Sequence, residues 1–254
     1  MLNEFIDKIN FILYNESNFE KKTLSLIDCI RSFNNENIYL QWCNYPDRFL
    51  IQEKISKLFK NFMSVSEYNF AKLILKNHVN VNLQIISDFF DGFLIKEYKY
   101  IRNECGIVND TNIKAHYIVI VGSGSIPISA ICYAANNNKE IVCIDKNCIS
   151  LRISKQLINK IGINNIRFEE CDAVNMNYNG FDIAVITAGS NPKDRIIAQI
   201  RKTTDTPIYG IIRKPIFLGE ILHEPCQIYK EPQTVICKSS IDSYFMAQSH
   251  LIRL

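Results

Sequence analysis

The chain begins with apolar residues at helical spacing and continues with short apolar runs separated by polar turns. Up to about residue 110, apolar side chains recur every three or four positions, as in Phe5, Ile9 and Ile12. This period is typical of amphipathic helices that bury one face. We therefore expect residues 1–110 to form a helical domain. The apolar faces of its helices are explained by packing alone and do not by themselves indicate a function.

From residue 111 to 254 the pattern predicts strands that alternate with helices. The predicted strands are 116–121, 140–144, 166–170, 181–187 and 208–213, with 234–238 and 244–247 as an antiparallel end; the predicted helices are 127–136, 150–161 and 194–202. Alternation of this kind is typical of a parallel sheet with crossover helices. The second domain is therefore predicted to be a Rossmann-like, doubly wound and mostly parallel sheet, so the whole chain is of the α/β class.

The first predicted strand ends in a glycine turn. Gly122, Ser123 and Gly124 follow it directly, and Pro127 suits the first turn of a helix, where a missing N–H is harmless. The glycines let a ligand approach the backbone, and the helix end offers N–H groups, so this arrangement can cradle a nucleotide. Pro127 stands where dinucleotide-binding proteins carry a third glycine, which disfavours a pyrophosphate. The turn alone leaves open S-adenosylmethionine (SAM), a dinucleotide, or no small ligand.

Further residues at strand ends favour a nucleoside. Asp145 follows the second strand, where a carboxylate can accept both hydroxyls of a ribose. Asp172 follows the third strand and is placed to accept from an adenine amino group, with Ala173 as a backbone donor. Thr187 ends the fourth strand, and the small residues after it leave space for a ligand. Each is commonly a turn or cap residue when taken alone. Their alignment at one sheet edge predicts a SAM-type site.

The segment before the sheet carries polar and aromatic residues at helical spacing. Glu97, Tyr100 and Glu104 share one face of the helix predicted there. They can form the polar wall of a pocket or an ordinary solvated face. Further along, His223 and Glu224 are adjacent, and neighbouring side chains on an extended chain diverge. With no third ligand nearby, we expect no metal site there.

Composition narrows the partners and the compartment. The net charge is +3, and basic residues are interspersed with acidic ones, so no nucleic-acid partner is expected. No apolar run reaches eighteen residues and MLNEFIDKIN does not resemble a signal peptide, so no membrane partner is expected. The nine cysteines are odd in number and form no CxxC pair, which favours reduced thiols and a cytoplasmic location. The size is compatible with a homodimer.

Several motifs together resemble one family. VGSGSIPISAI resembles the GSGPLP-type motif of nicotianamine synthases and of related bacterial enzymes that build opine metallophores such as staphylopine. FFDGFLIKEYKYI, FDIAVITAG, YGIIRKPIFLGEI and QTVICKS are similar to other parts of that family. The resemblance covers roughly residues 85–240, whereas the N-terminal helices match only in placement.

The resemblance implies a transferase that moves the aminobutyrate arm of SAM to an amine and releases methylthioadenosine. A glutamate and a tyrosine before the sheet are then expected to handle the acceptor amine. We assign Glu97 as the base, supported by Tyr100, with Glu104 or Tyr100 as the substitute base. The ungapped match places Tyr100 where the family tends to carry glutamate. Tyr98, Glu104 and Arg213 are expected to contact the substrate, with Arg213 binding a carboxylate.

The primary hypothesis is thus an aminobutyrate transferase of metallophore biosynthesis that acts on an amino acid such as histidine. A SAM-dependent methyltransferase of small molecules is the competing enzyme hypothesis, and it predicts S-adenosylhomocysteine as the by-product. A non-catalytic nucleotide-binding module predicts SAM binding without turnover. A nicotinamide-dependent dehydrogenase is disfavoured by Pro127.

Overall fold

The computed structural model describes residues 1–76, 100–101, 103–106, 113, 115–134, 139–223, 235–239 and 246–254. Its first four helices are α1 (Leu2–Asn15), α2 (Phe19–Phe33), α3 (Glu36–Cys43) and α4 (Arg48–Lys76), as the apolar spacing predicts. Asn18 and Asn35 begin α2 and α3, because each side-chain oxygen accepts a backbone N–H of the first turn, from Lys21 and Ile38. Residues 100–101 and 103–106 are also helical.

The remaining elements alternate as the sequence predicts. They are β1 (Tyr117–Val121), α7 (Ile128–Ala134), β2 (Glu140–Asp145), α8 (Cys148–Ile161), β3 (Ile166–Glu170), β4 (Ile183–Ile186), α9 (Lys193–Thr203), β5 (Tyr209–Pro215), η1 (Phe217–Leu222), β6 (Val235–Lys238) and β7 (Ala247–Arg253). Asn147 caps the start of α8, and Gly162 ends it with a positive φ of 80°.

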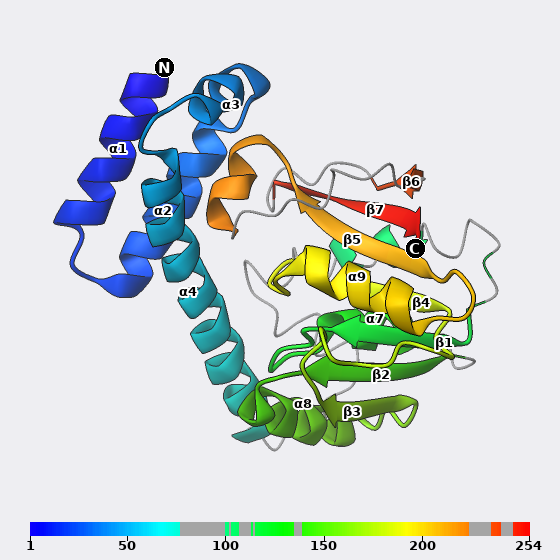
Figure 1. Ribbon diagram of the computed structural model, residues 1–254. Coiled ribbons are helices and arrows are strands. Elements are labelled where there is room, and N and C mark those ends of the chain that lie inside the picture. The colour runs from blue at the N-terminus through cyan, green and yellow to red at the C-terminus, as the bar shows by residue number, and fades with distance from the viewer. Residues whose placement is uncertain are drawn as a thin grey trace. The chain divides into compact units, whose positions relative to one another are not determined.

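The strands form one seven-stranded sheet in the order β3-β2-β1-β4-β5-β7-β6 (Figure 1). The pairs from β3 to β5 are parallel, and β6 with β7 is antiparallel, which confirms the doubly wound, mostly parallel sheet. After Tyr117 every residue of β1 is buried, so this central strand is covered on both faces. One strand prediction is wrong in its bounds: the last strand was expected over 244–247, whereas β7 begins at Ala247 and runs to Arg253.

The strand register places the carboxyl ends of the strands at one edge. Val121 of β1 pairs with Ile144 of β2 and with Ile186 of β4, and Ile186 pairs with Ile212 of β5. The residues that follow these positions therefore lie side by side at this edge. They are Gly122, Asp145, Thr187 and Arg213, which are among the residues predicted for the site.

The chain divides into two compact units, each of which combines distant segments. One comprises Met1–Val65, Lys214–Pro225 and Ile241–Gln248, and the other Ser66–Arg213, Cys226–Ser240 and Ser249–Leu254. The first division falls inside α4. The domain boundary predicted at residue 110 stays a prediction, because the packing that defines a compact unit does not have to change where the secondary structure changes.

The first unit has an apolar core of its own, to which a late segment of the chain contributes. Phe5, Ile30 and Trp42 are buried there together with Leu218 of η1 and Met246. Polar contacts bind η1 to the helices: the Tyr39 hydroxyl donates to Glu220 Oε2 at 2.8 Å, and Gln52 Nε2 donates to the Glu220 carbonyl at 2.8 Å. No helix in the described part of the chain combines the length and the apolar character that crossing a membrane requires.

Candidate functional site

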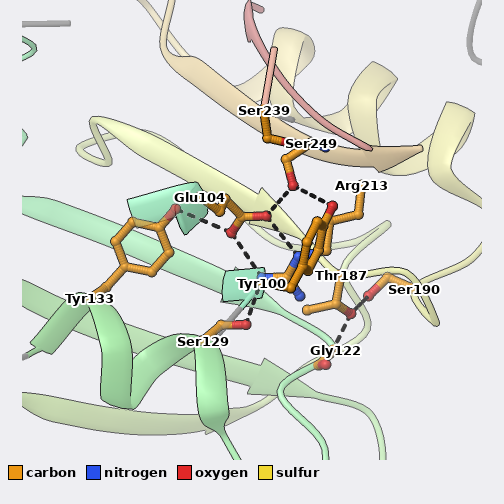
Figure 2. Close-up of polar contacts among 10 residues, drawn as sticks. All are labelled: Tyr100, Glu104, Gly122, Ser129, Tyr133, Thr187, Ser190, Arg213, Ser239 and Ser249. Carbon is orange, nitrogen blue, oxygen red and sulfur yellow. Dashed lines mark hydrogen bonds and ion pairs between the residues drawn. The ribbon is translucent and has the colours of Figure 1, made fainter. Parts of the chain in front are cut away.

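The glycine turn after β1 has the backbone conformation that only glycine adopts readily. Gly122 has a φ of 73° and Gly124 a φ of 68°. The Gly122 carbonyl accepts from Thr187 Oγ1 at 3.1 Å (Figure 2). Ser190 Oγ donates to the Val121 carbonyl at 2.8 Å. A Cβ on Gly122 would collide with the Ser190 hydroxyl and lie 2.9 Å from Thr187 Oγ1. The turn is thus packed directly against the end of β4.

Two carboxylates accept the backbone N–H groups of this turn. Gly124 N donates to Asp145 Oδ2 at 3.0 Å, and Ser125 N donates to Glu67 Oε2 at 3.3 Å. Glu67 is a half-buried residue of α4, within the same compact unit as the sheet. A phosphate at the turn would have to displace these carboxylates or lie beside them. The turn therefore suits a ligand that carries positive charge better than a pyrophosphate.

The loop after β3 joins the same edge. Cys171 N donates to the Asp145 carbonyl at 3.2 Å, which places this loop beside the end of β2. Asp172 is exposed, and its Oδ1 accepts from Val174 N at 3.2 Å. The Ala173 carbonyl accepts from the hydroxyl of Tyr178 at 2.9 Å. The predicted adenine contacts and the predicted ribose contact at Asp145 thus come together.

A buried ion pair lies near the carboxyl end of β5. Arg213 Nε donates to Glu104 Oε2 at 2.8 Å, and Arg213 Nη2 donates to Glu104 Oε1 at 2.9 Å (Figure 2). The side chains are 6% and 1% exposed, so water screens this bidentate pair little. Burial alone would lower the pKa of Arg213, but the Glu104 carboxylate outweighs it and raises that pKa well above its ordinary value. The guanidinium therefore stays charged.

Hydroxyl groups from several elements surround the pair. Ser249 of β7 donates to Glu104 Oε2 at 2.6 Å, and Tyr133 of α7 donates to Glu104 Oε1 at 3.3 Å. Ser129 accepts from Arg213 Nη2 at 2.9 Å, and Tyr100 bonds to Ser249 at 2.7 Å (Figure 2). Burial, followed by the charge of Glu104, raises the pKa of Tyr133 well above its usual range. Tyr133, which contacts the ion pair from α7, therefore stays uncharged.

The predicted site residues fall into two groups and two exceptions. One group lies at or beside the glycine turn and comprises Gly122, Ser123, Gly124, Asp145 and Thr187, with Asp172 and Ala173 next to them. Pro127 stands immediately before α7. Tyr100, Glu104 and Arg213 meet in the buried network. The two exceptions, Glu97 and Tyr98, lie outside the described residues.

Sequence reasoning missed several polar residues of this region, among them Ser129, Tyr133, Glu67 and Ser249. Ser129 stands two positions after Pro127, so the start of α7 gave a signal for it. Tyr133 follows one turn later on the same helix. No sequence signal indicated Glu67 or Ser249. Glu67 is a polar residue within a helical pattern, and Ser249 interrupts an apolar strand. Among the described residues, no group of three His, Cys, Asp or Glu side chains is placed to hold a metal ion.

Solved structures show where this fold occurs. The chain is similar to MtNAS, a nicotianamine synthase: a variant in complex with S-adenosylmethionine matches with a TM-score of 0.80 and 16% identity, over 97% of this chain and 96% of that one. MtNAS in complex with MTA and tNA matches with a TM-score of 0.78 and 16% identity, over 99% and 96% of the two chains. No protein-family model matches the chain, and no curated protein sequence does. The chain thus has the MtNAS fold along nearly its whole length.

Proposed function

We propose that the protein is a nicotianamine synthase-like transferase that moves the aminobutyrate arm of SAM to the amine of an amino acid and releases methylthioadenosine. The observation that carries this proposal is the pair of carboxylates, Asp145 and Glu67, that accept the N–H groups of the glycine turn. SAM is a nucleoside with a positive sulfonium and no phosphate, so it fits these charges. The MtNAS fold, which occurs with SAM and with MTA bound, supports the same ligand.

The strand-end residues supply the contacts that a nucleoside needs. Asp145 is placed for the ribose hydroxyls, and Asp172 with Ala173 for the adenine. Thr187 lies beside Gly122 at the end of β4, where the sulfonium end of the ligand would be received. Arg213 follows the register pair Ile186 and Ile212 and is placed to bind a carboxylate.

The reaction requires one bond to form in line with the bond that breaks. The acceptor nitrogen attacks the first carbon of the aminobutyrate arm, the carbon–sulfur bond breaks, and its electron pair stays on sulfur. All three carbons on the sulfonium are electrophilic, so the direction from which the amine approaches decides which group is transferred. The amine must be neutral to attack, so a base has to hold the proton that it loses.

Glu67 is a candidate for that base. Its Oε2 is at the glycine turn, where the reacting end of SAM is expected. The assignment of Glu97, supported by Tyr100, remains a prediction. Glu104 is poorly suited to be the base, because Arg213, Ser249 and Tyr133 all donate to its carboxylate.

The biological setting is also part of the proposal. An aminobutyrate adduct of an amino acid such as histidine offers amine and carboxylate groups that can chelate a metal. We therefore expect the product, rather than the enzyme, to bind metal, as in metallophore biosynthesis.

Incubation of the purified protein with SAM and a pool of amino acids tests the proposal. We expect mass spectrometry to detect methylthioadenosine together with an acceptor that is heavier by one aminobutyrate unit. S-adenosylhomocysteine as the by-product would contradict it and indicate a methyltransferase.

A further inference from the structure

The Glu104 carboxylate has no acceptor position left for a substrate. An ionised carboxylate offers about four lone-pair positions. Arg213 fills two of them, Ser249 fills a third and Tyr133 a fourth. A base must direct a lone pair at the proton that it takes. Glu104 would have to give up one of these partners before it could act as a base.

The same contacts leave part of the Arg213 guanidinium available. Nε and one N–H of Nη2 donate to Glu104, and the other N–H of Nη2 donates to Ser129. Within the described ranges, the two N–H groups of Nη1 have no hydrogen-bond partner. The guanidinium is planar, so fixing Nε and Nη2 also fixes the direction of Nη1.

The direction of each hydroxyl bond follows from the carboxylate. Glu104 can only accept, so the single hydroxyl hydrogen of Ser249 is used in the bond to Glu104. Tyr100 must then donate to Ser249, which gives an ordered chain from Tyr100 through Ser249 to Glu104 (Figure 2). The Ser249 backbone is itself fixed, because its N–H donates to Ser239 Oγ at 2.9 Å.

We propose that Glu104 is a positioning residue, held by Ser249, that orients Arg213 so that Nη1 receives the carboxylate of an amino-acid ligand. This inference rests on the proposed function and deepens it, because it names the recognised group. Glu104 then takes no proton from the substrate. The carboxylate can belong to the aminobutyrate arm of SAM or to the acceptor, since both present the same group to the guanidinium.

Paired ligands separate these two sources. Methylthioadenosine lacks the aminobutyrate arm but keeps the nucleoside, so calorimetry with SAM and with methylthioadenosine isolates the contribution of the arm. The variants are Glu104→Gln and Ser249→Ala. Ser56→Ala is the control, because it removes another buried hydroxyl, one that donates to the Glu53 carbonyl in the other compact unit.

We expect both variants to weaken the binding of one carboxylate ligand, by about tenfold or more for Glu104→Gln and less for Ser249→Ala. If Arg213 holds the arm, the Kd of SAM rises while that of methylthioadenosine does not. If it holds the acceptor, the Kd of SAM is unchanged and the KM of the acceptor rises. In both cases we expect kcat to stay within about threefold of the value for the unaltered protein. Loss of a general base would instead lower kcat by about 10²–10⁴.

Two results would overturn the inference. A large loss of kcat in Glu104→Gln with unchanged Kd and KM would make Glu104 the base, and unchanged values in both variants would leave the network with a structural role only. If Glu104→Gln does not fold, Ser249→Ala decides by itself. Failure of the proposed function is distinguishable, because the unaltered protein would then bind no SAM or release no methylthioadenosine.

Discussion

Backbone N–H groups at a glycine turn are commonly available to an anion, but here side-chain carboxylates accept two of them. Asp145 takes Gly124 N and Glu67 takes Ser125 N. A unit charge about 4 Å from another contributes about 4 kcal/mol at an effective dielectric constant near 20, before desolvation. Repulsion of that size opposes a pyrophosphate, and the corresponding attraction favours a sulfonium.

Glu67→Gln keeps the shape of the side chain and removes its basicity. We expect this variant to lose about 10²–10⁴ in kcat, which is the usual contribution of a general base. We also expect it to bind SAM more weakly, because one of the two negative charges at the glycine turn is lost. Glu53→Gln is the matched control, because it is the same change at an exposed position of α4. Full turnover in Glu67→Gln would contradict the assignment of Glu67 as the base and favour Glu97, supported by Tyr100.

Asp145→Ala removes the proposed acceptor for the ribose hydroxyls, together with the acceptor of Gly124 N. We expect the Kd of SAM, measured by calorimetry, to rise about tenfold or more, as for the loss of a charged hydrogen bond. Asp205→Ala is the control, because this carboxylate lies in the loop between α9 and β5 and accepts from Asn179 Nδ2 at 2.7 Å. Unchanged SAM affinity in Asp145→Ala would remove Asp145 from the site.

The elements were predictable where local patterns decide them. The strand predicted over 166–170 agrees with β3, because apolar and polar residues alternate at its start. The predicted end of α8 at Gly162 also agrees, because a glycine caps the helix there. The bounds of β7 were not predictable in this way. Ser249 and His250 are buried polar residues inside that strand, so they interrupt the apolar run. What buries them is long-range packing, which one-dimensional patterns do not contain.

The same limit applies to the candidate site. Strand ends and a glycine turn indicated Asp145 and Thr187, because the carboxyl ends of parallel strands meet at one edge. The pairing of Glu104 with Arg213 joins residues 109 positions apart. Glu67 reaches the turn from α4, 58 positions before Ser125. Contacts of this kind depend on the placement of whole elements, so the residues could be suspected singly but not paired.

The glycine turn is an element whose packing can be tested. Gly122→Ala places a Cβ against Ser190 and Thr187 at a positive φ, and Gly162→Ala, also at a positive φ, meets no atom within 4 Å. We expect Gly162→Ala to cost about 1 kcal/mol of unfolding free energy from backbone strain, and Gly122→Ala to cost more. Urea denaturation measures both. Equal losses would show that the turn is not packed tightly against the end of β4.

At the scale of the molecule, the fold shared with MtNAS extends over both compact units. Each unit combines distant segments, so neither corresponds to one continuous stretch of the chain. The first unit includes η1, which follows β5 directly and is bonded to the N-terminal helices through Tyr39 and Gln52. The first unit therefore depends on a segment that follows β5 in the chain.

A ligand that binds only the folded chain stabilises it by mass action, by about 2.7 kcal/mol at a hundredfold excess over Kd. We expect SAM and methylthioadenosine to raise the Tm of the protein by several degrees, and NAD to leave it unchanged because of the carboxylates at the glycine turn. Differential scanning fluorimetry with the three ligands measures this. A shift with NAD alone would contradict the assignment of the site.

The most direct measurement follows the aminobutyrate arm itself. SAM is supplied with one isotope label in the methyl group and a different label in the arm, together with amino-acid acceptors, and the products are separated and weighed. We expect the arm label to leave with the acceptor while the methyl label stays in methylthioadenosine. Transfer of the methyl label to the acceptor, with the arm label retained in S-adenosylhomocysteine, would contradict it.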